Sequence, residues 1–241
     1  MCEKQSYNRS TLAQEFEQLF QRLGTLSQKD WGEDVLCDVL YDMCLSIPNH
    51  NYVTFMLDED SVNQVMKQLE TELQVKCPQF KSVQMPVSYL LEELICNIQQ
   101  HAEADNGQLF SNYDENCSYI EIALADHGRS IYGSYVHANK FLDLIGNSDA
   151  AALSLAKDGY STKNRPNAEN RGYGISSNIR IVTEGLKGEF ALYSGNALFL
   201  KTCDETKLLE LPETLDMKGT IVAVRIPTDI PNEFDFYKYV S

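Results

Sequence analysis

The most informative part of the chain lies between Val87 and His101 and reads VSYLLEELICNIQQH. Its apolar residues recur at three- and four-residue intervals, which is the period of an amphipathic helix. Glu93, Asn97 and His101 follow one another at four-residue steps, whereas Glu92 points elsewhere. A helix therefore places a carboxylate, an amide and an imidazole along one flank of its buried stripe, at the border between core and solvent.

The neighbouring segments predict a sheet that this helix covers. Residues 52–57 indicate a short strand and residues 58–75 a helix. Residues 107–113 and 118–125 are typical of two strands joined as a hairpin. Farther along, the pattern predicts helices near 130–141, 148–157 and 172–184, a polar loop over 158–171, and strands near 189–193, 197–203 and 220–226.

This order favours an α+β protein, a two-layer sandwich. Residues 1–48 carry apolar positions at helical spacing and predict a helical N-terminal extension. Residues 50–228 then form the main domain, and residues 229–241 form a C-terminal tail.

Composition limits the classes of partner. The chain has 241 residues, with 20 Lys and Arg against 35 Asp and Glu, a formal net charge of −15. That acidity disfavours binding to nucleic acid and to anionic membranes, because nothing neutralises their phosphates. No apolar run is long enough for a membrane span, and the N-terminus lacks the apolar core of a secretory signal. We therefore expect a soluble, cytoplasmic protein.

Three further short motifs accompany the helix. Asp126-His-Gly128 ends a predicted strand, Gly172-Tyr-Gly174 precedes a predicted helix, and Gly219-Thr220 opens the last strand. Each alone has an ordinary explanation: a turn, a flexible helix entry or a strand start. The spacing of Glu93 and Asn97 is likewise compatible with an exposed polar helix edge.

In this order and on these elements, the four motifs resemble the GHKL superfamily. These are the histidine-kinase-like ATPases, and this chain is most similar in style to the anti-sigma-factor serine kinases and the ATP-binding domains of sensor kinases. The resemblance extends from Tyr52 to Pro227. It implies a Bergerat-type ATP-binding fold, which has a mixed sheet with helices on one face, and it implies ATP and Mg²⁺ as cofactors.

The resemblance also implies roles for single residues. Glu93 matches the carboxylate that orients or deprotonates a water, which is general-base work. Asn97 matches the residue whose amide oxygen binds Mg²⁺, a cation that prefers oxygen ligands. Asp126 matches the acceptor of the adenine amino group, with Gly128 allowing close backbone approach and Thr220 supplying a hydroxyl near the same edge.

The sequence contains no P-loop motif that could bind the phosphates. Gly172 and Gly174 match the glycines before a helix whose first amides face the anion. Lys163 and Arg171 lie in the loop that occupies the family's ATP-lid position, where they either contact phosphate or are simply solvated. Two roles for His101 stay open, a contact with phosphate and a packing role.

One departure from the family is Ser130, which replaces the second glycine of the motif that begins at Asp126. If the backbone there needs a positive φ, serine adds strain of order 1 kcal/mol, and ATP affinity falls.

Two functions follow as expectations. The first is an enzyme that slowly hydrolyses Mg-ATP, or transfers its phosphate to a partner protein, in cytoplasmic regulation. The second is a non-catalytic, ATP-responsive module that binds a regulatory protein, as an anti-sigma factor does. Residues 1–48 hold no histidine, so autophosphorylation of the sensor-kinase kind is not expected. Whether these residues dimerise or cover the sheet stays open.

Overall fold

The computed structural model describes residues 51–113, 116–162, 174–211, 213 and 216–240. The extension predicted for residues 1–48 and most of the predicted loop over 158–171 lie outside the described residues. The strands are β1 Asn51–Met56, β2 Asn106–Tyr113, β3 Tyr119–Asp126, β4 Glu189–Gly195, β5 Ala197–Lys201, β6 Thr206–Glu210 and β7 Met217–Pro227. The α-helices are α3 Glu59–Lys76, α4 Phe80–Asn97, α5 Ile131–Ala138, α6 Leu142–Ile145, α7 Asp149–Lys157, α8 Ile175–Arg180 and α9 Tyr237–Val240. Two π-helical turns, η1 Ile98–Ala102 and η2 Ile181–Gly185, extend α4 and α8.

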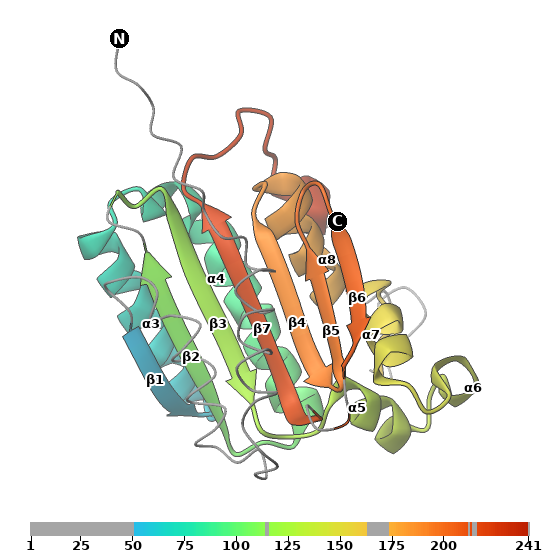
Figure 1. Cartoon of the computed structure of the whole chain (residues 1–241). Coiled ribbons are helices and arrows are strands. Elements are labelled where there is room, and N and C mark those ends of the chain that lie inside the picture. The colour runs from blue at the N-terminus through green and yellow to red at the C-terminus, as the bar shows by residue number, and fades with distance from the viewer. Residues whose placement is uncertain (1–50, 114–115, 163–173, 212, 214–215, 241) are drawn as a thin grey trace.

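The described strands form one seven-stranded sheet in the order β1-β2-β3-β7-β4-β5-β6 (Figure 1). The α+β class is confirmed, but the prediction of a mixed sheet is wrong, because every neighbouring pair is antiparallel. Short connections make β2–β3, β4–β5 and β5–β6 antiparallel. The last strand, β7, inserts between β3 and β4, so the two strands joined by the helical crossover never pair with each other.

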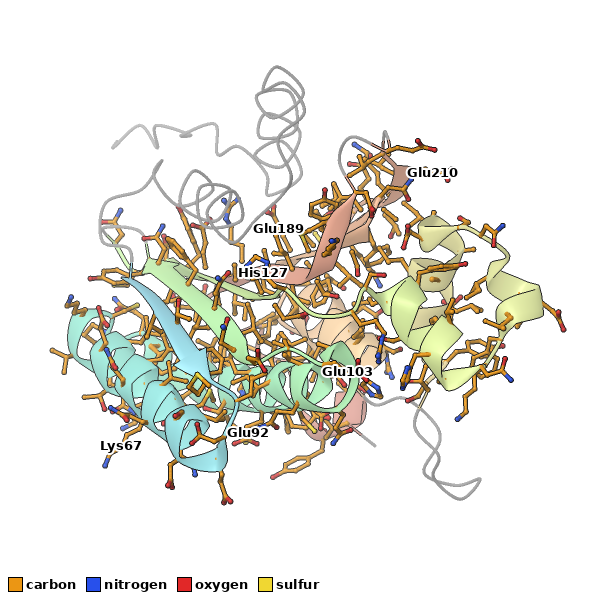
Figure 2. All side chains as sticks on the ribbon, turned by 90° about the horizontal axis from the view of Figure 1, so that it is seen from below. Lys67, Glu92, Glu103, His127, Glu189 and Glu210 are labelled. Atoms are coloured by element: carbon orange, nitrogen blue, oxygen red, sulfur yellow. The ribbon has the colours of Figure 1, made fainter. Side chains whose placement is uncertain are left out.

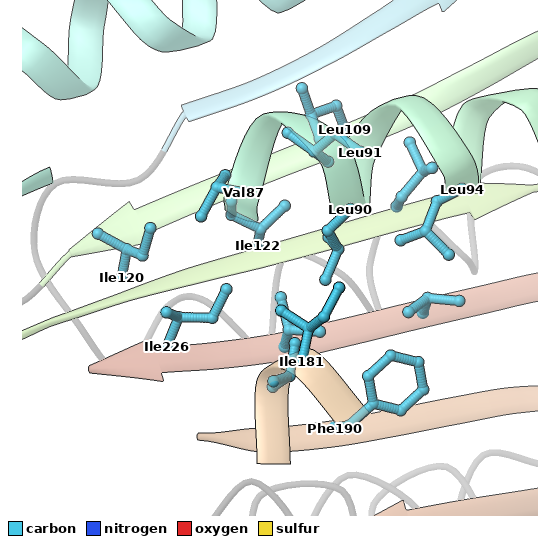
Figure 3. Packing of buried hydrophobic residues seen from close by; sticks show 14 of the residues in the cluster. Val87, Leu90, Leu91, Leu94, Leu109, Ile120, Ile122, Ile181, Phe190 and Ile226 are labelled. Carbon is cyan, nitrogen blue, oxygen red and sulfur yellow. The ribbon is translucent and has the colours of Figure 1, made fainter. Parts of the chain in front are cut away.

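Helices α3, α4 and α8 lie behind the sheet in the view of Figure 1. One face of α4 meets alternate residues of the strands, and Figure 3 shows this packing. Leu90 and Leu91 of α4 are 0% and 1% exposed, and Ile122 of β3 is 3% exposed. The period of the helix and the alternation of the strands thus generate one core. Among the described residues, no helix is both long and apolar enough to cross a bilayer.

The informative helix begins earlier than its sequence suggests. It starts at Phe80 rather than near Val87 and carries Pro86 in its interior. A proline there removes one backbone hydrogen bond, which normally disfavours a helix. Phe80 and Val83 extend the same apolar stripe and are both 0% exposed, so their burial offsets the loss.

Three elements were not predicted: β6, α6 and α9. All five residues of β6 are exposed, so the strand lacks the buried alternation by which strands are recognised. The segment after β7, predicted as a tail, packs against the helical layer. There Phe236 is 9% exposed and its ring meets that of Tyr89 edge-on, with centroids 5.3 Å apart.

Candidate functional site

A cavity of about 430 Å³ lies between α4, the ends of β3 and β7, α5 and the first residues of the predicted lid loop. Its lining includes most of the predicted site residues that the structure describes, namely Glu93, Asn97, His101, Asp126, Gly174 and Thr220. Gly128 lies beside the cavity without lining it. Lys163, Arg171 and Gly172 lie outside the described residues. The fold therefore brings segments that are far apart in the sequence together around one cavity.

Asp126 and Thr220 form one end of this cavity. They are partners in the register of β3 and β7, so their side chains point to the same side of the sheet. Asp126 is 3% exposed, and its Oδ1 accepts a hydrogen bond of 2.9 Å from the Gly128 amide. Burial raises the pKa of this carboxyl to about 7, although the Gly128 bond opposes the shift.

A buried hydroxyl on β4 orients Thr220. Ser194 Oγ donates to the Gly219 carbonyl at 2.8 Å and accepts from the Ile131 amide at 2.9 Å. It also lies 3.0 Å from the Thr220 hydroxyl. Because the single proton of Ser194 is used on Gly219, Thr220 is the donor in that contact. The Thr220 oxygen therefore offers the cavity only lone pairs.

Two glycines let backbone segments meet at this end. A Cβ on Gly219, whose φ is +98°, would lie 2.0 Å from the Asp126 carbonyl oxygen. A Cβ on Gly128 would lie 2.1 Å from the carbonyl oxygen of Ala102, to which the Arg129 amide donates. The close approach at Gly128 is thus to the end of the α4–η1 helix. The family resemblance implies that Gly128 lets the backbone approach adenine. The structure adds a second reason for glycine here, which is the close contact with Ala102.

Glu93 and Asn97 line the cavity from α4, one helical turn apart. Gly174 lies against Asn97, since a Cβ there would be 3.0 Å from Asn97 Nδ2. Tyr89, one turn before Glu93, has a raised pKa because of burial and, secondarily, the Glu93 charge. No cluster of three or more acidic, His or Cys side chains suited to a metal occurs among the described residues.

His101 contacts the first residues of the predicted lid loop. Its Nδ1 lies 3.0 Å from the Thr162 hydroxyl, and the Thr162 carbonyl accepts a 3.0 Å hydrogen bond from Lys140 Nζ. Tyr135 donates to the Tyr160 carbonyl at 2.6 Å. These bonds fix one wall of the cavity, so His101 has a positioning contact in the fold.

Ser130 is not strained. Its φ is −61°, and its Oγ accepts a 3.0 Å hydrogen bond from the Gly133 amide as the N-cap of α5. The condition for the predicted strain, a positive φ, is not met. The expected loss of ATP affinity at this position therefore has no structural basis, because serine is among the preferred N-cap residues.

We expect Ser130→Ala to lower the free energy of unfolding by about 1 kcal/mol and Ser130→Gly by only a few tenths, since glycine is tolerated at an N-cap. Ser148→Ala is the matched control, because Ser148 caps α7 in the same way. Urea denaturation measures all three. A Ser130→Gly protein that is more stable than the wild type would mean that serine is strained after all.

Several residues of the site were missed by sequence reasoning. The cavity is also lined by Arg129, Tyr135 and Thr162. The Ser194 hydroxyl contacts the Thr220 hydroxyl. Arg129 pairs with Glu103. Because it directly follows Gly128 in the sequence, its closeness to the site could have been predicted. Ser194 reaches the site only through the pairing of β4 with β7, which no local pattern reveals.

Comparison with protein-family models, with curated proteins and with solved structures found no match to this chain.

Proposed function

We propose that the cavity binds ATP with Mg²⁺, and that the protein hydrolyses ATP slowly or transfers its terminal phosphate to a partner protein. The observation that carries this proposal is the pairing of Asp126 with Thr220 at one end of the cavity. Above its pKa of about 7 the Asp126 carboxyl is ionised and accepts hydrogen bonds only, and the Thr220 proton is directed to Ser194. Two acceptors therefore lie side by side.

Two adjacent acceptors select a ligand that presents donors. The exocyclic amino group of adenine has two N–H donors, whereas guanine presents a carbonyl oxygen at the same ring position. A buried acceptor left facing an oxygen costs about 1–3 kcal/mol, which disfavours guanine. We therefore expect Asp126 to accept directly from the amino group, and Thr220 to accept from it directly or through one water.

The polyphosphate and its cation would lie along α4, beside Asn97 and Glu93. Asn97 would hold Mg²⁺ through its amide oxygen, since this cation prefers oxygen ligands. When bound, Mg²⁺ neutralises charge on the phosphates. Glu93, one helical turn away, would orient or deprotonate the attacking water. No structural cluster of acidic ligands is needed for such a site.

We expect Glu93→Gln to lower the rate of phosphate release by at least about a hundredfold while leaving Mg-ATP binding within a few-fold, because a lost general base typically costs 10²–10⁴ in rate. The measurement is release of radiolabelled phosphate alongside a nucleotide titration. Glu92→Gln is the matched control, since Glu92 is the adjacent exposed residue of the same helix (Figure 2).

The outcomes separate the two functional classes. Saturable binding of ATP but not GTP, with equal phosphate release in the wild type and Glu93→Gln, would leave the ATP-responsive binding module in place of the enzyme. Absence of saturable Mg-ATP binding in the wild type would contradict both the enzyme and the ATP-responsive binding module.

A further inference from the structure

The sheet is also buried on the face opposite α3, α4 and α8. Along each central strand, alternate residues point away from the helical layer, and Phe110, Tyr193 and Ile221 are only 1%, 0% and 0% exposed. None of the three belongs to the core that the strands share with the helices. In the described part of the chain, α3, α4 and α8 lie behind the sheet, and α5, α6 and α7 lie toward its β6 side (Figure 1).

The same face carries a buried charged network. Arg225 Nε donates to Glu121 Oε1 at 2.6 Å, and its Nη1 donates to Glu189 Oε2 at 3.2 Å. The Arg225 and Glu121 side chains are each 9% exposed. Asn112 adds a 3.1 Å hydrogen bond to Glu121. Ions this poorly exposed require a layer that keeps water away.

We propose that residues 1–50 of the same chain form this layer, packing on the second face of the sheet as a third layer. The chain enters the sheet at Asn51, the first residue of β1, and β1 is an edge strand. The segment is therefore tethered beside the face. Tethering gives an effective concentration in the millimolar range, which favours a docked segment over a second copy. This inference is independent of the proposed nucleotide chemistry.

The dimensions of the segment fit the face. Five strands from β2 to β5 span about 19 Å at about 4.8 Å per spacing. Two helices of about 10 Å diameter lying side by side cover that width. Two apolar helical stripes are available in the sequence: Leu12, Phe16, Leu19, Phe20 and Leu23 in one, and Val35, Leu36, Val39, Leu40 and Cys44 in the other. Both would turn toward the sheet.

The first test places charge on one stripe of the full-length chain. We expect Phe16→Asp with Phe20→Asp to lower the urea midpoint of the whole protein by about 1 M or more, because the second face loses its cover. The emission of Trp31, the single tryptophan, should shift to longer wavelength. Gln14→Asp with Gln18→Asp, on the opposite helical face, is the matched control and should change neither. An unchanged midpoint in the stripe variant would overturn the proposal.

The second test uses the wild type and does not depend on a variant folding. Unlabelled and ¹⁵N-labelled proteins are mixed and treated with a lysine cross-linker. We expect Lys29 to link to Lys207, on the exposed edge strand β6, within one copy. Links to Lys67, on α3 at the far side of the sheet, should be much rarer (Figure 2). Links between labelled and unlabelled chains would assign the layer to a second copy, and preferential links to Lys67 would place the segment elsewhere. Either result overturns the proposal.

Discussion

Replacing Asp126 with asparagine is expected to weaken Mg-ATP binding by about a hundredfold or more, and at the same time to stabilise the unliganded protein at pH 8. In the variant, Oδ1 would keep the hydrogen bond from the Gly128 amide. The amide nitrogen would then face the ligand as a donor against the donor amino group of adenine. A mismatch of about 3 kcal/mol at a buried position corresponds to the expected loss in affinity.

The stability gain follows from the raised pKa. Asp126 has a pKa of about 7 in the folded protein against an ordinary value of 3.8, so the folded state binds the proton more tightly. The wild-type free energy of unfolding must therefore fall as pH rises from about 4 to about 7, by a few kcal/mol at most. Asparagine has no charge to desolvate, so the variant escapes this loss.

Isothermal titration measures the binding, and urea denaturation at pH 5 and pH 8 measures the stability. Asp229→Asn, at an exposed position, is the control and should alter neither. Wild-type affinity in Asp126→Asn would show that Asp126 does not recognise the ligand. A stability difference of the same size at both pH values would contradict the role of the buried charge.

Gly219→Ala is expected to be the most damaging single substitution near the site, with a loss of about 3 kcal/mol or more in the free energy of unfolding. Two effects add. The backbone has a φ of +98°, which an L-residue with a side chain adopts only at a cost. The new Cβ would also lie 2.0 Å from the Asp126 carbonyl oxygen and 2.8 Å from its carbon, so β3 and β7 would have to separate.

Gly146→Ala separates these effects. Gly146 has a φ of +54°, and a Cβ there meets no atom within 4 Å. We expect it to cost about 1–2 kcal/mol, the strain of the backbone conformation alone (φ +54°, ψ −125°). Urea denaturation compares the two variants. Equal losses would mean that the contact with Asp126 relaxes without cost, and would contradict a tight junction of β3 and β7 beneath the site.

The predictable parts of the fold are those with a short-range cause. Alternation predicts the hairpin of β2 and β3 and helical period predicts α3, and both are confirmed. The structure also shows that Asp58 is the N-cap of α3. The start of α4 was not, because Pro86 argues against a helix until the burial of Phe80 and Val83 is known. Likewise β6 could not be predicted, because its residues are exposed and it is recognised as a strand by its pairing with β5.

Local sequence is enough to place Glu93, Asn97 and His101 on one helical flank, because residues four apart on a helix lie on the same side. It also determined that Asp126 ends a strand. Only the tertiary structure decided that Asp126 lies opposite Thr220, that Ser194 directs the Thr220 proton, and that the sheet is buried on both faces. Those facts depend on which strands pair and in what register, and pairing between distant strands is decided by the packing of the whole core.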